Sequence, residues 1–170
     1  MIKTSIQDAI NQQIVREMYS SNLYLAMASY YATQNLNGFS KWMHFQAEEE
    51  MMHALKFFDY LVNRGGKPEV GAIAAPKKDW DSPLQAFTDA YAHEQLVTSW
   101  IYDIVDLAIA EKDHATHSLL QWFVNEQVEE EANTSLIVDK LKLIGPDPQG
   151  LFLIDSELGN RPAPTPIAAK

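Results

Sequence analysis

Apolar side chains recur with helical spacing along four long stretches of the chain, and turn residues separate these stretches. Gly38 is the only glycine between Met1 and Arg64, and Pro83 is the only glycine or proline between Asp79 and Ile144. Because glycine and proline both disfavour helix interiors, stretches with so few of them are typical of long helices. The pattern therefore predicts an all-α fold.

Capping and turn residues predict where each helix begins and ends. We expect four long helices at about residues 5–33, 39–64, 83–112 and 114–143, and a short fifth helix at about 150–158. Ser5, Ser82 and Asp113 are the expected N-caps, and Pro83 follows Ser82 at the position that favours proline.

The linkers predict how the helices are arranged. Short turns join the first helix to the second and the third to the fourth, which favours antiparallel pairs. About 17 residues rich in glycine, proline and alanine separate the second helix from the third. Fully extended, they would reach roughly 55 Å, whereas a helix of 26 to 30 residues is about 40 to 45 Å long. The sequence predicts a four-helix bundle with one long crossover and a short C-terminal fifth helix. We expect one domain over residues 1–159 and a flexible proline-rich tail over residues 160–170.

On each of the four long predicted helices, the apolar residues with helical spacing form one stripe along the helix, and each of these apolar stripes carries polar residues near its middle. In chain order these are Glu17 on the first helix, Gln46, Glu50 and His53 on the second, Glu94 on the third, and Gln127 and Glu130 on the fourth. Taken singly, any of these carboxylates could lie on a stripe edge and reach solvent. Burial of all of these carboxylates without a partner would strongly destabilise the bundle, because each buried ion costs several kcal/mol even after relaxation. No Lys or Arg lies on these stripes, so we expect a bound cation.

A repeated spacing supports one polar centre. The pairs Glu17 and Glu94, Glu49 and Glu126, Glu50 and Gln127, and His53 and Glu130 are each separated by 77 positions. Oxygen donors with one imidazole suit a hard or borderline divalent metal. A Glu from two helices and an i, i+3 pair from each of the others is the ferritin-like di-iron arrangement. The second pair here is Gln127 and Glu130, which should hold its metal more weakly or asymmetrically.

Composition narrows the function classes further. Thirteen Lys and Arg against 23 Asp and Glu give a formal net charge of −10, which opposes binding to nucleic acid. The absence of cysteine excludes disulfide scaffolds, thiolate metal sites and cysteine nucleophiles. The N-terminus lacks an apolar signal core, and the charge-free apolar stretch 23–32 is too short to span a bilayer. We expect a cytoplasmic protein with no membrane partner.

At these residues the chain resembles the bacterial non-haem ferritins, over residues 1 to about 159. The matching segments are Glu17–Ser21, Glu48–His53, His93–Leu96, Leu120–Glu131 and, at the fifth helix, Gly150–Asp155. The resemblance implies a shell of twenty-four identical subunits. It also implies a ferroxidase that oxidises Fe(II) with dioxygen or hydrogen peroxide and stores the ferric mineral inside. We expect the apolar fifth helix to pack against other copies of the chain.

The resemblance also implies a role for individual residues. Glu17, Glu50 and His53 would hold a first iron, and Glu94 and Glu130 a second, with Gln127 beside it. Glu49, Glu126 and Glu129 match a third iron position of the bacterial proteins. Tyr24 and Trp122 match aromatic residues that could supply an electron, although an ordinary core role is an equal alternative. Haem is not expected: Met51 coincides with the haem methionine of bacterioferritins, but that family has His where this chain has Glu130.

Two other functions remain open from the sequence. A rubrerythrin-like di-iron oxidase or peroxidase would use the same bundle without storage, but such proteins usually carry a cysteine-bound iron module. A metal-free helical scaffold would hold the same carboxylates by hydrogen bonds. Formation of a soluble brown particle on addition of Fe(II) in air would distinguish storage from both.

Overall fold

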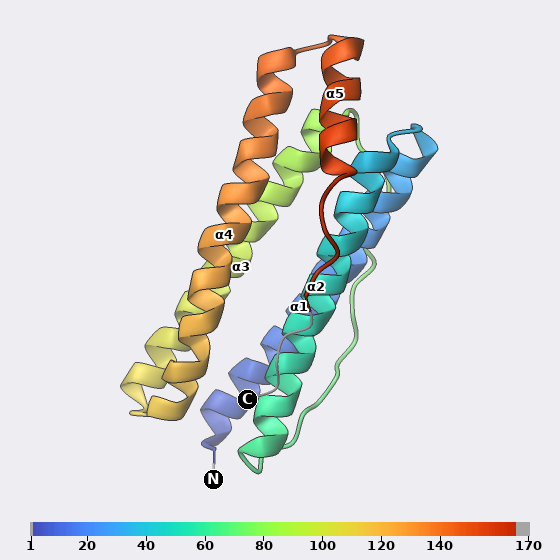
Figure 1. Cartoon of the computed structure of the whole chain (residues 1–170). Coiled ribbons are helices and arrows are strands. Elements are labelled where there is room, and N and C mark those ends of the chain that lie inside the picture. The colour runs from blue at the N-terminus through green and yellow to red at the C-terminus, as the bar shows by residue number, and fades with distance from the viewer. Residues whose placement is uncertain (1, 166–170) are drawn as a thin grey trace.

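The computed structural model of the protein describes residues 2–165 (Figure 1). Within that range the fold contains five α-helices, in agreement with the predicted all-α bundle. They are α1 (Thr4–Thr33), α2 (Asn37–Asn63), α3 (Pro83–Ala110), α4 (His114–Ile144) and α5 (Pro148–Leu158). Residues 166–170 of the predicted flexible tail lie outside the described residues. No helix in the described part of the chain is both long enough and apolar enough to cross a membrane.

The helices form two closely packed pairs, α1 with α2 and α3 with α4, and α1 also packs against α3. The segment between α2 and α3 runs along the outside of the bundle from one end to the other (Figure 1). The predicted long crossover is therefore present. After α4 the chain reverses, and α5 packs against α2 and α4 at one end of the bundle.

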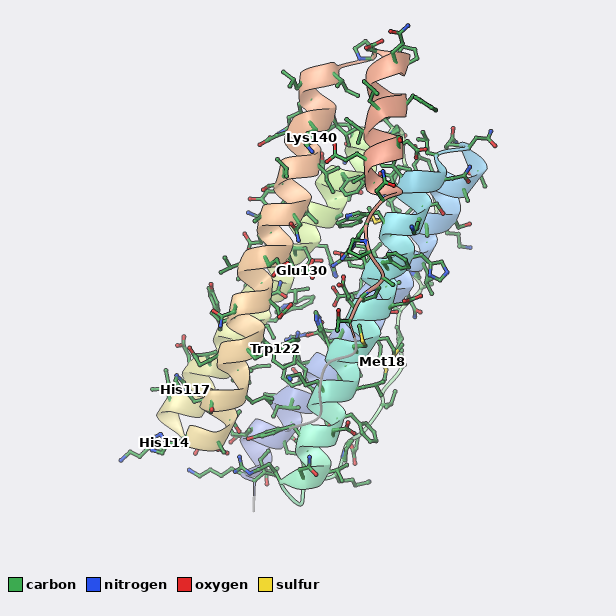
Figure 2. All side chains as sticks on the ribbon, in the orientation of Figure 1. Met18, His114, His117, Trp122, Glu130 and Lys140 are labelled. Carbon is green, nitrogen blue, oxygen red and sulfur yellow. The ribbon has the colours of Figure 1, made fainter. Side chains whose placement is uncertain are left out.

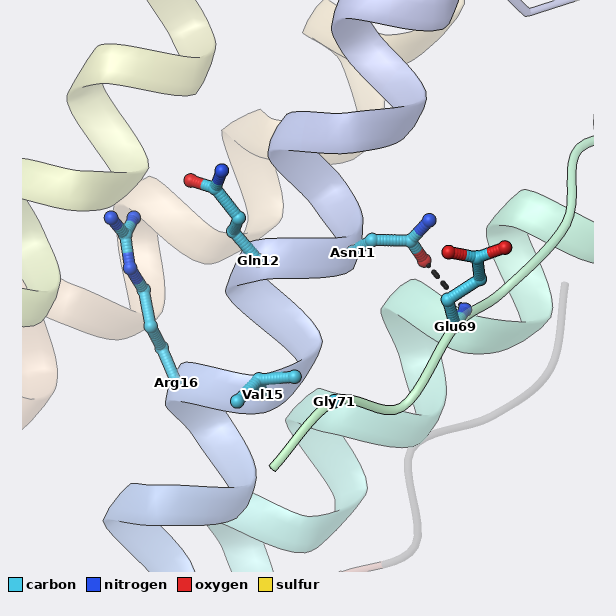
Figure 3. A pocket seen from close by; sticks show the side chains of 6 residues that line it. All are labelled: Asn11, Gln12, Val15, Arg16, Glu69 and Gly71. Carbon is cyan, nitrogen blue, oxygen red and sulfur yellow. Dashed lines mark hydrogen bonds between the residues drawn. The ribbon is translucent and has the colours of Figure 1, made fainter. Parts of the chain in front are cut away.

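Side chains of α1 hold the start of the crossover in place. Gln7 Oε1 accepts a hydrogen bond of 2.9 Å from the backbone N–H of Lys67. Asn11 donates to the Lys67 carbonyl oxygen at 3.1 Å and accepts from the Glu69 N–H at 2.9 Å (Figure 3). A surface hollow of about 470 Å³ lies beside this contact, lined by Asn11, Gln12, Val15, Arg16, Glu69 and Gly71. It contains none of the predicted metal ligands.

Two of the three expected N-caps are present. Ser82 accepts a hydrogen bond from the N–H of Gln85 at 3.1 Å, and Pro83 follows it at the first helical position. Asp113 accepts from the N–H of Thr116 at 3.0 Å. Both caps satisfy an N–H group that has no partner within its own helix.

The expected Ser5 cap was wrong. The first helix begins at Thr4, and Lys3, at the cap position, makes no side-chain cap hydrogen bond. The Ser5 hydroxyl donates instead to Glu111 Oε1 at 3.1 Å. Glu111 directly follows α3, so this tertiary contact takes the hydroxyl that local geometry would have used for capping.

Gly38 lies inside α2 rather than in the turn before it, and its lack of a side chain makes room for α5. A Cβ atom added at Gly38 would lie 1.7 Å from the Asp155 carbonyl oxygen. The Asp155 carboxylate accepts from the N–H groups of Gly38 and Phe39, at 2.8 and 3.0 Å. Since Leu36 provides no side-chain cap, α5 satisfies the free donors at the start of α2.

The apolar core consists of two clusters, one toward each end of the bundle. The cluster nearer α5 includes Tyr31, Phe39 and Phe87, and the other includes Ile10, Phe57 and Phe123. The polar residues of the four stripes lie between the two. No α2 residue has its Cα within 8 Å of an α4 Cα. These two helices therefore meet through long side chains, and the centre of the bundle has room for polar groups.

Candidate metal centre

Seven polar side chains are buried in the layer between the two apolar clusters, with exposed fractions of 0 to 6%. They are Glu17 of α1, Gln46, Glu50 and His53 of α2, Glu94 of α3, and Gln127 and Glu130 of α4. Figure 2 shows Glu130 near the middle of α4, with Trp122 two turns closer to its start. Burial of four carboxylates in one layer requires a source of positive charge or a set of protons.

Glu17, Glu50 and His53 form a compact group. One ligand atom from each lies within 4.8 Å of the other two. His53 Nδ1 is 3.5 Å from Glu50 Oε2. The Glu17 Oε2 atom is buried and has no hydrogen-bond partner among the described residues 2–165. Buried oxygens without a partner are rare, so an orphaned carboxylate oxygen beside a second carboxylate and an imidazole fits a divalent metal ion.

The electrostatics of this group favour a cation. Burial raises the pKa of Glu17 well above its usual value, and the negative charge of Glu50 raises it further. Burial likewise raises the pKa of Glu50, and repulsion from Glu94 adds to the effect. The charged forms of these groups are therefore unfavourable in the metal-free protein. A divalent cation would reverse that balance, because it stabilises the carboxylates as anions.

Hydrogen bonds occupy the second half of the layer more fully than the first. Glu94 accepts through one oxygen from the Tyr24 hydroxyl and through the other from Gln127 Nε2, the latter at 3.2 Å. Glu130 Oε2 accepts from Gln46 Nε2 at 2.5 Å. Burial is the main reason that the pKa values of Glu94 and Glu130 are raised. The related positions 77 residues apart thus have different partners, and the two half-sites are asymmetric.

The two aromatic residues singled out by sequence lie beside different residues of this layer. Tyr24 is fully buried and donates its hydroxyl to Glu94. Burial, with repulsion from Glu94, raises the pKa of Tyr24 well above its usual value, so the phenol stays protonated. Trp122 is half-buried, and its ring centroid lies 5.4 Å from that of His53. Both rings are therefore next to predicted ligands.

The three predicted residues outside the main layer lie toward solvent. Glu49 and Glu126 are half-buried, whereas Glu129 is exposed. Burial is the main cause of a raised pKa at Glu126, His53 opposes the increase, and the charges of Glu129 and Glu49 add to it. The charges of Glu49 and Glu129 thus act on Glu126, but among the described residues the group of candidate ligands that lies within mutual ligand distance is Glu17, Glu50 and His53.

Sequence reasoning missed two groups around the layer, Gln13 and Arg161. Gln13 donates to Glu17 Oε1 at 2.8 Å. It stands four residues before Glu17 on the same helix face, a spacing that could have identified it. Arg161, beyond α5, contacts Glu49. No local signal identifies that contact, because the two residues are 112 positions apart.

Comparison with known proteins gives a consistent result. Residues 7–144 match the family model of the ferritin-like domain. A bacterial non-haem ferritin of Bacteroides fragilis is 47% identical over 161 residues, which cover 95% of this chain and all of the relative. One from Staphylococcus aureus is 38% identical over 161 residues, covering 95% of this chain and 97% of the relative. A solved structure described as a novel open pore ferritin, from the hyperthermophilic archaeon Archaeoglobus fulgidus, superposes with a TM-score of 0.95 at 49% identity. The match covers 95% of this chain and all of that one.

Proposed function

The chain belongs to the ferritin family, and from that premise we propose that it is an iron-storage ferroxidase that oxidises Fe(II) inside the bundle. The observation that carries the proposal is the orphaned Glu17 Oε2 atom in the buried group of Glu17, Glu50 and His53. A metal-free scaffold would be expected to satisfy or remove that oxygen. A substrate cation that arrives and leaves needs a ligand without a permanent protein partner.

The substrate iron ions are held by two sets of side chains. Glu17, Glu50 and His53 hold the first ion. Glu94 and Glu130 hold the second, with Gln127 beside them. Glu50 is the proposed link between the two sets, since its carboxylate is 3.5 Å from His53 and the negative charge of Glu94 raises its pKa. The second set must first give up hydrogen bonds from Tyr24 and Gln46, so we expect the first ion to bind more tightly.

The chemistry follows from the donor set. Carboxylates stabilise Fe(III) more than Fe(II) because the product ion carries the larger charge, which lowers the barrier to electron loss. Two Fe(II) ions held together release two electrons. These electrons and two protons reduce one dioxygen to hydrogen peroxide, or one hydrogen peroxide to two waters. We propose Tyr24 as a donor of one further electron to the oxidant, with its hydroxyl proton passing to Glu94, which accepts its hydrogen bond.

Substitution of the ligands tests the assignment. His53→Ala removes the only nitrogen donor of the buried group, and Glu17→Ala removes the orphaned oxygen. We expect each to abolish rapid Fe(II) oxidation at low iron loading, followed by absorbance in air. His44→Ala is the matched control, because His44 lies on the same helix with a side chain that is 59% exposed. Rapid oxidation that survived in both ligand variants would contradict the proposed centre.

A third iron position is proposed at Glu49, Glu126 and Glu129. Mutual repulsion among these carboxylates is relieved by a cation, and they lie beside the main layer rather than within it. The double substitution Glu49→Ala with Glu129→Ala should leave fast oxidation of the first two ions nearly intact and alter the ratio of iron oxidised to oxygen consumed. Anaerobic Fe(II) titration should show one site fewer, and an unchanged site count would rule out this position.

Storage requires a shell, and α5 offers part of the surface for one. Ile154 and Leu158 are buried in their own bundle, which leaves the other apolar side chains of α5 for the expected contact with other copies. Phe152 and Leu153 remain 70 and 68% exposed, and Leu143 nearby is 88% exposed. Exposed apolar groups of this size favour contact between subunits. We propose an assembly of twenty-four copies located in the cytoplasm. Sedimentation at micromolar concentration should give that mass, and iron loading in air should give a soluble brown particle. A monomer or dimer would contradict storage.

A further inference from the structure

Arg161 lies three residues beyond α5, in the part of the chain that passes back along α2 (Figure 1). Its Nη2 group donates to Glu49 Oε2 in an ion pair. Its Nη1 group donates to the Trp42 carbonyl oxygen at 3.2 Å, and its guanidinium carbon lies 4.5 Å from the Trp42 ring centroid. The arginine side chain is only 18% exposed, so these contacts form a defined site rather than a loose surface pair.

The same guanidinium is connected to the buried layer through one amide. Arg161 Nη1 donates to Gln46 Oε1 at 2.9 Å, and Gln46 Nε2 donates to Glu130 Oε2 at 2.5 Å. An amide whose oxygen faces a guanidinium must direct its N–H groups the other way. Arg161 therefore favours the Gln46 orientation that occupies Glu130. One cation thus acts on two carboxylates, directly on Glu49 and through Gln46 on Glu130.

We propose that Arg161 is a displaceable internal cation: its guanidinium pairs with Glu49 at the third iron position and must leave before iron binds there. This inference rests on the proposed third position. Arginine suits the role because its planar guanidinium pairs with a carboxylate and stacks on an aromatic ring at the same time. A divalent ion carries twice its charge and can contact three carboxylates, so iron displaces the guanidinium when it is abundant.

Displacement has a structural consequence. Besides the Arg161 contacts, the Lys41 ammonium holds the segment that follows α5 by donating to the Gly159 carbonyl oxygen at 2.7 Å. When iron displaces Arg161, the segment 160–165 loses its contacts with Glu49 and Gln46. Gln46 is then free to rotate away from Glu130, which makes Glu130 available to iron. Glu49 and Glu130 are therefore released together, and filling of the third position is coupled to release of the C-terminal segment.

The test compares metal binding in the assembled, iron-free protein with that in three variants. Arg161→Ala removes the competing cation, and Arg161→Lys keeps the positive charge but replaces the planar guanidinium with an ammonium group. Lys140→Ala is the matched control, because it removes a cation whose ion-pair partner is Glu157 of α5 rather than Glu49. Anaerobic Fe(II) calorimetry counts the sites and measures each affinity, and redox-inert Zn²⁺ is the comparison probe. We expect Arg161→Ala to tighten the third site by about 3- to 20-fold, the range for losing a partly exposed charge-assisted contact. Arg161→Lys should be intermediate and Lys140→Ala unchanged.

A second measurement reports the displacement itself. Zn²⁺ binding at the third position of the unmodified protein should change the fluorescence of Trp42, because the guanidinium leaves its ring. The Arg161→Ala variant should show the changed Trp42 fluorescence before any Zn²⁺ is added, and Zn²⁺ at the third position should not change it further. The fluorescence change should be missing in Trp42→Phe, which identifies Trp42 as its source.

The outcomes separate this inference from the proposed third site. Three sites with a tighter third site in Arg161→Ala, or a third site that appears only in that variant, support the displaceable cation. Three sites with an unchanged or weaker third site would overturn it and leave the third site in place. Two sites in every protein would overturn both.

Discussion

Glu17→Gln should make the metal-free protein more stable and the metal-loaded protein less stable. In the structure, Glu17 Oε1 accepts from Gln13 and Oε2 has no partner. Glutamine has nearly the same shape. Its amide oxygen can keep the bond from Gln13, and its N–H groups would then stand where Oε2 was, close to Glu50. The substitution therefore removes a titratable group whose charged form is unfavourable in this layer, and it supplies a donor to a neighbouring carboxylate.

The magnitude follows from the group that is removed. A buried polar atom without a partner costs about 1–3 kcal/mol, which should be recovered in the variant without metal. For a chain of this size, each kcal/mol raises the melting temperature by about 2–4 °C. The stability gained by the metal-free Glu17→Gln variant, relative to the native protein, should grow as pH rises. Because the folded-state pKa of Glu17 is raised, the folded protein binds more protons than the unfolded chain, and native stability falls as pH rises from the unfolded value toward the folded one. Glutamine does not titrate, so the variant lacks this loss.

Bound metal should reverse the order of stability, so that the native protein is more stable than Glu17→Gln. A ligand present at a hundred times its dissociation constant stabilises the native state by about 2.7 kcal/mol, and the variant should lose most of that effect. Thermal unfolding at equal protein concentration, with chelator and then with Zn²⁺, measures both quantities. Glu48→Gln is the control, because the Glu48 side chain is 52% exposed and its change should stay within about 0.5 kcal/mol. A variant that is less stable than the native protein in chelator, or that keeps the full Zn²⁺ effect, would refute the reasoning.

Three further predictions concern the fold and the net charge. Gly38→Ala places a Cβ 1.7 Å from the Asp155 carbonyl oxygen, so α5 should detach and sedimentation should show less assembled protein; an unchanged assembly would contradict the close approach. His93 is buried beside Ser20 at 2.8 Å, and burial lowers its pKa to about 4. The free energy of unfolding therefore keeps the full contribution of neutral His93 above pH 6.5 and loses roughly 3 kcal/mol as pH falls toward 4, because the unfolded chain binds the proton first. Urea unfolding should show that the His93→Gln variant avoids this loss. The net charge of −10 should steer Fe(II), so uptake should slow as ionic strength rises, and a rate independent of salt would exclude steering.

The sequence alone determined the helices and the composition of the polar layer. Both depend on local information: apolar periodicity fixes which face of a helix is buried, and capping residues such as Ser82 and Asp113 fix where helices begin. A glutamate on a buried face is visible in the sequence because its position violates the pattern. Glu17, Glu50 and His53 could therefore be selected by their positions on the apolar stripes, and the fold brings these three together.

Only the tertiary structure decided which partner each of these groups takes. Glu94 pairs with Tyr24 across 70 positions, Gln46 with Glu130 across 84, and Arg161 with Glu49 across 112. Such contacts depend on the rotation and spacing of packed helices, and a shift of one residue along a helix moves a side chain by about 100°. The periodicity of a single helix carries no information about its neighbour's rotation. For that reason the identity of the buried carboxylates, and the Gln127 that makes the second pair unlike the first, can be read from the sequence, whereas their hydrogen-bond partners and the arginine that reaches them depend on how the helices pack.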